Sequence, residues 1–496
     1  MTVSLSSVVA AIEEAGVVVG PTHPDRGRLG ELGVGGVQHD SRRVGPGDLF
    51  VAWRGAVADG HDHLVAVAGL GAAAAIVERP VPGAPLPQIQ VDNARLAGAV
   101  ASSHLMGDPW RALSLVGVTG TNGKTTTALL LRWLLSRKGP AAAIGTLGVV
   151  GPEGRPLPGT RGLTTPDSVQ LARRLRELAD EGVESVVVES SSHGLSQHRL
   201  DGVRFQVAAF TNLTQDHLDY HGTPERYLAA KARLLQLGRS GATAVVNADD
   251  PAWESLRPPG RVVNYGIDAP AELRAEGTRL HSAGSSFGLA WCGGVRPVEL
   301  PLAGRFNVSN ALAAAGCALA LGRPLDEVAA GLSSAPQIPG RMETLVREPF
   351  QVIVDFAHTP DALEQVLRTL RSVATGRVVV VFGAGGDRDP AKRPAMGRAA
   401  ARHADLAIVT SDNPRTEDPA GIVAEVVRGV AESGGRAEEI LDRRQAIVHA
   451  LEVAEPGDVV LLAGKGHERV QIVGSARLPF DERQVVLDHL AERSER

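Results

Sequence analysis

Short apolar runs alternate with amphipathic segments through most of this 496-residue chain. In its middle part, short and mostly apolar runs predict strands, and the amphipathic segments between them predict helices. The predicted strands cover 113–118, 141–144, 185–188, 207–210 and 242–246. This alternation indicates a mostly parallel sheet, which binds ligands at the carboxyl ends of its strands.

The same pattern begins again near residue 340. Strands are predicted at 352–355, 378–382, 406–410 and 459–463, with helical segments such as 360–373 and 420–432 between them. The residues before about 110 instead mix short strands and helices with turns rich in glycine and proline. We therefore predict an α/β chain of three domains. They are a small mixed α/β domain (1–110), a central domain with a mostly parallel sheet (111–339) and a C-terminal Rossmann-like, doubly wound domain (340–496).

Composition narrows the class of protein. Hydrophobic residues make up 43% of the chain and charged residues 22%, as in ordinary globular proteins. The net charge of -5 argues against a nucleic-acid partner. Two cysteines, Cys292 and Cys317, exclude a disulfide framework and fit a reducing cytosol. Residues 1–20 carry Glu13 and Glu14 and no basic segment, so we expect a short helix there rather than a signal peptide. We predict a cytoplasmic protein without membrane insertion.

The segment Gly117–Thr127 reads GVTGTNGKTTT and lies between a predicted strand and a helical pattern over 129–135. In this context a glycine-rich loop cradles phosphates, its lysine reaches the terminal phosphates, and the next hydroxyl binds Mg²⁺. The standard spacing, G-x-x-x-x-G-K, would require glycine at Val118, but the nearest upstream glycine is Gly120. The shortened loop favours a variant P-loop ATPase over a common GTPase.

Lysine is rare in this chain. Of the 51 lysine and arginine residues, only Lys124, Lys138, Lys231, Lys392 and Lys465 are lysines. A lysine kept in such a chain is a candidate for a task arginine does poorly, such as placing a compact ammonium or losing a proton. We assign Lys138, in a polar segment after a helix, to chance retention.

Two predicted strands end in polar clusters that suit a metal. The first ends at Glu189, whose carboxylate would lie beside the phosphate-binding strand. The second is followed by residues 211–222, which contain Asp216, His217, Asp219 and His221. Helix capping and turn formation are the alternative for both clusters. We prefer that alternative for His221 alone, and a site for Glu189 and His217.

Lys231 lies in a predicted helix over 225–237 and is flanked by alanines. A buried lysine usually extends its ammonium to solvent or pairs with an acid. Near a metal cluster a second role is plausible, because a deprotonated amine can take up CO₂ and become a carbamate, an anionic metal ligand. Arginine stays protonated and cannot do this.

Three polar turns follow strands of the C-terminal sheet: Gly383–Asp389, Asp412–Arg415 and Gly464–Glu468. Each alone would be a turn with a solvated charge. Together, at one sheet edge, they predict a pocket for a zwitterion with more than one carboxylate. Arginines of the first two turns would bind carboxylates, and Glu468 would bind an ammonium.

With these motifs, the sequence resembles the Mur ligases, the ATP-dependent amide-forming enzymes of peptidoglycan precursor synthesis. The resemblance covers essentially the whole chain. It rests on the loop Gly120–Thr126, the Glu189 and His217 motifs, the helix of Lys231, and the segments Gly304–Asn310 and Asp355–His358. The Asp412–Arg415 turn resembles that of the diaminopimelate-adding type.

The resemblance implies an activity. The enzyme would add diaminopimelate, with the meso isomer favoured over LL, to the D-Glu γ-carboxylate of UDP-N-acetylmuramoyl-L-Ala-D-Glu through an acyl phosphate. It would use ATP and Mg²⁺, have only small-molecule partners and act as a monomer. His217 or His358 could accept a proton from the attacking amine.

The resemblance also implies roles for individual residues. ATP would be bound by Gly120, Thr121, Asn122, Gly123, Lys124, Thr125, Thr126, Asn307, Asn310, Arg341 and Asp355. The UDP-sugar peptide would be bound by Ser41, Thr164, Thr165, Ser191, Gln197 and Arg199. Diaminopimelate would be bound by Arg388, Asp412, Asn413, Pro414, Arg415, Gly464 and Glu468. Mg²⁺ would be bound by Thr125, Glu189, His217 and carbamylated Lys231, and the catalytic residues would be Lys124, Glu189, His217 and Lys231.

Two other readings of the sequence stay open. A folylpolyglutamate synthase-like ligase shares a short P-loop, but about 110 residues precede the loop here, which favours a nucleotide-sugar domain. A P-loop switch without ligase activity would not need so many charged turns at strand ends. Phosphate release that requires both co-substrates would distinguish a ligase from a switch.

Overall fold

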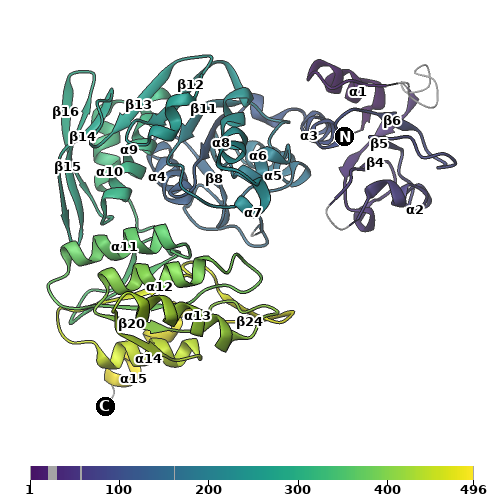
Figure 1. Cartoon of the computed structure of the whole chain (residues 1–496). Coiled ribbons are helices and arrows are strands. Elements are labelled where there is room, and N and C mark those ends of the chain that lie inside the picture. Colours follow the sequence, from purple (N-terminus) through teal and green to yellow (C-terminus); the bar gives the residue numbers. More distant parts are fainter. Residues whose placement is uncertain (1, 21–30, 56–57, 161, 495–496) are drawn as a thin grey trace. The chain divides into compact units, whose positions relative to one another are not determined.

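The computed structural model describes residues 2–20, 31–55, 58–160 and 162–494. Helices and strands are interspersed along the whole described chain (Figure 1). The chain divides into two compact units. The first comprises Met1–Asn264 and Ala313–Arg323, and the second comprises Tyr265–Leu312 and Pro324–Arg496. Helix α9 (Arg305–Ala320) passes from the second unit into the first. No helix in the described part of the chain is both long and apolar enough to span a membrane.

The N-terminal part of the first unit contains a parallel sheet in the order β3-β4-β5-β6. These strands are Gly36–Gln38, Asp48–Val51, Ala74–Val77 and Gln88–Gln90. Because side chains alternate along a strand, Leu49 of β4 packs with α1 (Leu5–Glu14) and α3 (Ala94–Leu105). Phe50 packs on the other face with α2 (Leu64–Gly69). The short helix expected near the N-terminus is therefore confirmed as α1.

The central sheet of the first unit contains all five predicted strands. They are β7 (Ser114–Thr119), β8 (Ala141–Gly145), β10 (Ser185–Glu189), β11 (Phe205–Phe210) and β12 (Gly238–Asn247). The order is β12-β11-β7-β10-β8, all parallel, and β9 (Gly148–Val150) adds an antiparallel edge to β8. The carboxyl ends of β7, β8, β10 and β11 therefore meet at one edge of the sheet.

Five helices accompany this sheet: α4 (Lys124–Ser136), α5 (Ser168–Asp180), α6 (Ser192–Ser196), α7 (Leu218–His221) and α8 (Pro224–Ala232). The helix expected over 225–237 is shorter than predicted. It ends as an α-helix at Ala232, and Arg233–Leu237 form a 3₁₀ turn. Strand β12 begins directly afterwards at Gly238. The last turn before the strand is therefore the narrower 3₁₀ form, with three residues per turn.

The second unit contains an antiparallel segment that the apolar pattern did not reveal. It consists of β14 (Leu273–His281), β15 (Gly284–Trp291) and β16 (Gly294–Leu300), followed after α9 by α10 (Leu325–Ser333). In each of β14 and β16 only two residues are buried, with an exposed residue between them: Leu273 and Ala275 in β14, and Val298 and Leu300 in β16. Their apolar residues are therefore never contiguous, and they lack the continuous runs that mark the buried strands.

The C-terminal sheet has the order β17-β18-β22-β19-β20-β21. The strands are Glu343–Val346, Gln351–Asp355, Val459–Ala463, Val378–Phe382, Leu406–Val409 and Ala437–Glu439, in that order. All neighbours are parallel except β17 and β18. The hairpin β23 (Val470–Val473) and β24 (Ala476–Pro479) lies outside this sheet.

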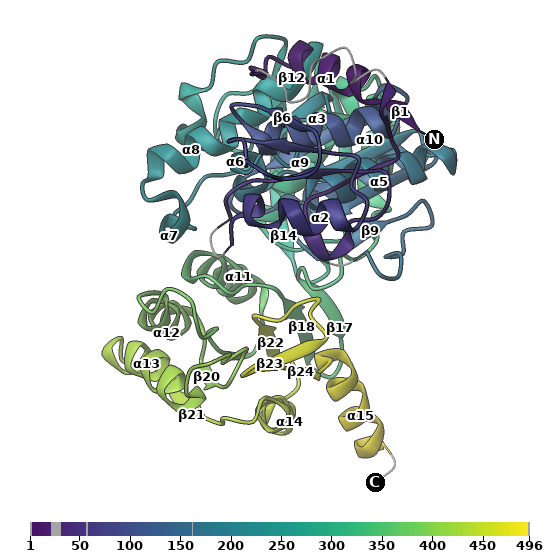
Figure 2. The ribbon, with the colours of Figure 1, turned by 90° about the vertical axis from the view of Figure 1, so that its right-hand side faces the viewer.

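Helices cover both faces of this sheet (Figure 2). Helices α11 (Pro360–Val373), α12 (Lys392–His403) and α13 (Pro419–Glu432) pack on one face. Helices α14 (Arg443–Val453) and α15 (Glu482–Ser494) pack on the other. The predicted doubly wound domain is therefore confirmed.

Candidate active site

The loop between β7 and α4 needs glycine at two positions. Gly120 has φ +151°, and a Cβ there would overlap Thr211 Oγ1. Gly123 has φ +83° and caps the N-terminus of α4 in the left-handed conformation. The loop therefore delivers the chain into the first turn of α4, where backbone N–H groups and the helix dipole favour a phosphate.

Hydrogen bonds fix this loop to the segment that follows β11. Thr121 N donates to Asn212 O at 2.7 Å, and Asn122 N donates to Asn212 Oδ1 at 2.9 Å. Thr211 Oγ1 donates to Asn122 O at 2.7 Å. Strand-end residues of β11 thus hold the phosphate-binding loop in shape. Thr211 and Asn212 belong to the polar segment 211–222 that follows a predicted strand, but no role in holding the loop was predicted for them.

Two lysines converge on one carbonyl of the loop. Lys124 Nζ donates to Gly120 O at 2.9 Å and to Thr121 O at 2.8 Å. Lys231 Nζ donates to the same Gly120 O at 2.7 Å and lies 4.4 Å from the centre of the Tyr227 ring. Burial, followed by repulsion from Lys124, lowers the pKa of Lys231 well below its usual range. A buried amine in this setting can exist in the neutral, nucleophilic form.

Glu189 is held by hydroxyl and amide donors at the end of β10. Its Oε2 accepts from Thr125 Oγ1 at 3.0 Å and from Thr146 Oγ1 at 3.1 Å. Its Oε1 accepts from Thr146 N at 2.9 Å. Gly145 makes room for this carboxylate, because a Cβ there would overlap it. Thr146, which the sequence analysis missed, could have been noticed as a hydroxyl residue at the end of a neighbouring strand.

The donor chemistry at this point suits Mg²⁺. The ion prefers oxygen ligands and typically binds one or two carboxylates together with water and substrate phosphates. The Glu189 carboxylate and the Thr125 hydroxyl provide such oxygens beside the phosphate-binding loop. Within the described ranges, no group of three or more His, Cys, Asp or Glu side chains could hold a metal alone. A site here would therefore depend on substrate oxygens as well.

His217 belongs to a cluster of aromatic side chains. It precedes α7 as its N-cap residue, with φ +53°, and its ring centre lies 4.7 Å from that of His193. His221, assigned above to a capping role, is buried and lies 5.2 Å from Tyr227, centre to centre. Burial, followed by repulsion from His217, lowers the pKa of His193 to about 4, so this ring is neutral at pH 7. The cluster links the His217 loop to the helix that carries Lys231.

The residues predicted to bind the sugar peptide form one network, except Ser41. Thr165 Oγ1 lies 2.7 Å from Glu189 O and 2.9 Å from Ser191 Oγ. Arg199 Nη1 donates to Thr165 O at 2.8 Å, and its Nη2 donates to Gln197 Oε1 at 2.6 Å.

Thr164 Oγ1 lies 3.2 Å from Thr146 Oγ1, which connects this network to the Glu189 carboxylate. Ser41 lies instead in the 3₁₀ turn Ser41–Arg43 that follows β3.

The second unit holds the remaining residues predicted for ATP. Asn307 and Asn310 lie on α9, and Asn310 Nδ2 donates to Asn307 Oδ1 at 3.3 Å. Asp355 ends β18 and accepts from Met342 N and Ala357 N, both at 2.7 Å. Burial raises the pKa of Asp355. The guanidinium of Arg341 lies 4.6 Å from the centre of the Phe356 ring.

The three polar turns of the C-terminal sheet meet at its carboxyl edge, as the strand order requires. Arg415 Nη1 donates to Gly386 O at 2.6 Å, joining the turns after β20 and β19. Asn413 Nδ2 donates to Glu468 Oε2 at 3.0 Å, joining the turns after β20 and β22. Asp412, Asn413, Pro414 and Gly464 are buried, Arg415 and Glu468 are half-buried, and Arg388 is exposed. This edge of the sheet therefore carries both a buried charged side chain, Asp412, and charged side chains that solvent reaches, such as Arg388.

An ATP-dependent ligase would have the three features described above. They are the phosphate-binding loop, the Glu189 carboxylate at the end of its strand, and the charged turns of the C-terminal sheet. Three family descriptions match the chain: "Mur ligase family, catalytic domain" at 33–104, "Mur ligase middle domain" at 118–318 and "Mur ligase, glutamate ligase domain" at 340–466. The chain belongs to the Mur ligase family and has its three-domain α/β architecture.

Among its curated relatives are proteins named UDP-N-acetylmuramoyl-L-alanyl-D-glutamate--2,6-diaminopimelate ligase. The one from Geobacter metallireducens is 43% identical, covering 97% of this chain and 99% of the relative. That from Geobacillus kaustophilus is 44% identical, covering 92% and 95%. A solved structure with the same enzyme name is 34% identical over the full length of both chains, with a TM-score of 0.70.

A folylpolyglutamate synthase from Mycobacterium tuberculosis resembles the chain in fold alone, at 22% identity over 75% of this chain with a TM-score of 0.62. The folate-type alternative therefore has the weaker support.

Proposed function

We propose that this chain is an ATP-dependent ligase that adds diaminopimelate to UDP-N-acetylmuramoyl-L-Ala-D-Glu during peptidoglycan precursor synthesis. The observation that carries the proposal is its 43% identity to a diaminopimelate ligase over 97% of the chain. The hydrogen bond between Asn413 and Glu468 supports the same substrate, because it joins two of the turns that were predicted to form the pocket for a diamino acid. The domain limits near residues 110 and 340 are part of this proposal, and the matched ranges 33–104, 118–318 and 340–466 support them.

In the first step, the D-Glu γ-carboxylate would attack the γ-phosphate of ATP, giving an acyl phosphate and ADP. Two anions must approach each other, so positive groups are needed around the transferring phosphoryl group. Lys124 would leave its bonds to the loop carbonyls and contact the terminal phosphates, while the loop amides bind the phosphate oxygens.

Mg²⁺ bound by Thr125, Glu189, His217 and the carbamate of Lys231 would add charge stabilisation at the phosphates. Loss of the proton from Lys231 is made easier by its burial and by the repulsion of Lys124. The carbamate would also remove the repulsion between the two lysines, because it carries a negative charge. The orienting bonds from Thr146 keep the Glu189 carboxylate pointed at the loop.

In the second step, the amine of diaminopimelate would attack the acyl phosphate and release phosphate. Arg388 and Arg415 would bind carboxylates of the amino acid, and Glu468 would bind an ammonium group. The exposed Arg388 is free to move onto a ligand, whereas Arg415 already bonds to Gly386 O. We infer that the substrate is the meso isomer and that the enzyme acts as a monomer. We also infer a cytoplasmic location, which the two free cysteines support.

The product itself tests this proposal. Purified protein is incubated with ATP, Mg²⁺, UDP-N-acetylmuramoyl-L-Ala-D-Glu and meso-diaminopimelate, and the mixture is analysed by mass spectrometry. We expect one new species with the mass of both substrates minus water, absent when ATP or either substrate is omitted. ADP formation without that species would refute the ligase assignment.

A further inference from the structure

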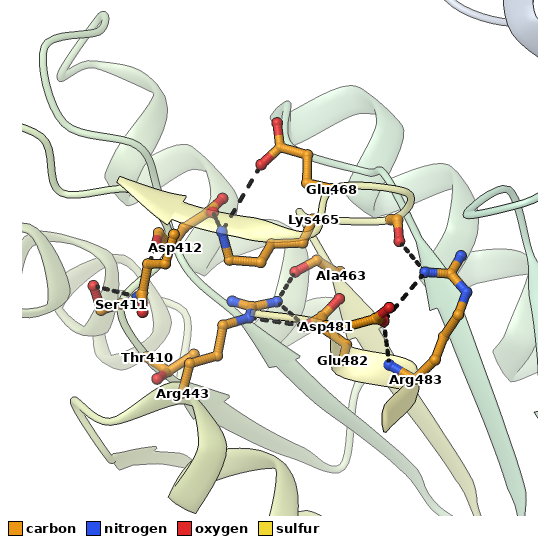
Figure 3. Close-up of polar contacts among 12 residues, drawn as sticks. Thr410, Ser411, Asp412, Arg443, Ala463, Lys465, Glu468, Asp481, Glu482 and Arg483 are labelled. Carbon is orange, nitrogen blue, oxygen red and sulfur yellow. Dashed lines mark hydrogen bonds and ion pairs between the residues drawn. The ribbon is translucent and has the colours of Figure 1, made fainter. Parts of the chain in front are cut away.

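The amino-acid edge of the C-terminal sheet contains a lysine that no solvent reaches. The side chain of Lys465 is fully buried, and its ammonium faces the turn after β20 (Figure 3). Nζ donates to Asn413 Oδ1 and to Val470 O, both at 3.0 Å, and lies 3.2 Å from Asp412 Oδ1. Two donor directions of the ammonium are taken by Asn413 Oδ1 and Val470 O, and the Asp412 carboxylate forms an ion pair beside them, so the fully buried Lys465 binds protein groups rather than substrate.

Lys465 decides which way the side-chain amide of Asn413 points. Asn413 Oδ1 accepts from Lys465 Nζ and also from Ile472 N at 2.9 Å. Two donors on this side require the oxygen here, so the NH₂ group must face the opposite way. There it donates to Glu468 Oε2 at 3.0 Å. The ammonium therefore fixes the Glu468 carboxylate through Asn413, although its own distance to Glu468 Oε2 is 3.8 Å.

Lys465 and the two carboxylates that it faces carry one net negative charge together. Lys465 lies between two carboxylates, Asp412 and Glu468. The neighbouring Arg443 is occupied by Glu482, with Nη2 and Oε1 2.7 Å apart and both side chains fully buried (Figure 3). The Lys465 ammonium attracts both the Asp412 and the Glu468 carboxylates, but its single positive charge neutralises only one of them. The half-buried Glu468 then presents a negative charge to an incoming ammonium group.

We infer that Lys465 is a positioning residue for the amino-acid substrate. It sets Asp412, Asn413 and, through Asn413, Glu468 in the arrangement that receives the ammonium group of the diamino acid. The inference rests on the proposed function, because it specifies how that same site is held. Arginine would not replace Lys465, since a planar guanidinium cannot place its donors where one compact ammonium meets these oxygens.

The test compares Lys465→Met with the wild type. Loss of a charged hydrogen-bond donor should raise the KM for the amino acid about 10- to 100-fold, with kcat changed less. The KM values for ATP and for the UDP-sugar peptide should stay within about twofold, because the interaction is confined to the amino-acid edge. Lys138→Met is the matched control, since Lys138 is exposed and should leave all three KM values unchanged. An unchanged KM for the amino acid in Lys465→Met would overturn the inference.

Two further measurements separate positioning from stability. Lys465→Arg keeps a buried cation, and a thermal melt checks that this variant is folded; its amino-acid KM should also rise at least about 10-fold. A wild-type KM in Lys465→Arg would show that charge alone matters. In an Asn413→Ala background, Lys465→Met should add less than about threefold, because its effect passes through Asn413. Fully additive effects would contradict this route. A wild type that uses another amino acid would refute the proposed substrate, but the KM comparison with that amino acid would still test Lys465.

Discussion

Gly145→Ala is expected to disable the enzyme without unfolding it. Gly145 ends β8, and an added Cβ would lie 2.6 Å from Glu189 Cγ and closer still to the carboxylate. The obstructing atoms belong to a flexible side chain, so Glu189 can rotate away while the sheet keeps its geometry. The rotation breaks at least two of the three hydrogen bonds that hold the carboxylate to Thr125 and Thr146.

Hydrogen bonds to charged groups contribute about 1.5–3 kcal/mol each, so losing two of the three would cost about 3–6 kcal/mol. If that energy positions the carboxylate in the transition state, turnover should fall by about 10²- to 10⁴-fold. The assay is ADP formation with all substrates present, together with a thermal melt. Gly69→Ala is the control, because a Cβ there meets nothing within 4 Å. A folded Gly145→Ala enzyme with kcat/KM within about twofold of wild type would refute the role of Glu189.

Four further substitutions test separate parts of the account. Lys124→Ala should abolish ATP-dependent turnover, because the terminal phosphates lose their cation; near-wild-type phosphate release would contradict the P-loop assignment. Lys231→Ala should be inactive and partly restored by added short carboxylates that replace the carbamate, whereas full activity without any additive would argue against that ligand. Arg415→Ala should reduce the preference for diaminopimelate over L-lysine by about 2–3 kcal/mol in kcat/KM, and an unchanged preference would remove Arg415 from recognition. Arg443→Met should lower the free energy of unfolding by about 3–5 kcal/mol in urea titrations, because it leaves Glu482 buried and unpaired; a loss below about 1 kcal/mol would contradict this.

The sequence predicts those parts of the fold that depend on local pattern. The strands at 185–188 and 378–382 consist almost entirely of valine and other apolar residues, and Gly123-Lys124 marks the loop between a strand and a helix. Strand β14 was missed because only alternate residues such as Leu273 and Ala275 are buried, so its apolar signal is weak. The pattern also overextended the helix of Lys231, since 3₁₀ and α-helical turns have similar spacing.

Contacts between distant loops were harder to predict. The rarity of lysine singles out Lys465, but nothing near it in the chain shows that its ammonium bonds to Asn413, 52 residues away. That contact depends on the order of β20, β19 and β22 in the sheet. The bond between Thr146 and Glu189 likewise depends on β8 lying beside β10. Such pairings follow from the register of parallel strands and not from any local motif.

Phosphate release from ATP is the most direct measurement of the central claim. It is followed with UDP-N-acetylmuramoyl-L-Ala-D-Glu present, comparing meso-diaminopimelate, LL-diaminopimelate and L-lysine. The account predicts release with meso-diaminopimelate and little above background with L-lysine or without an amino acid. Equal or faster release with L-lysine would contradict the assigned role of the Asp412–Arg415 turn, and release that needs no amino acid would contradict the ligase itself.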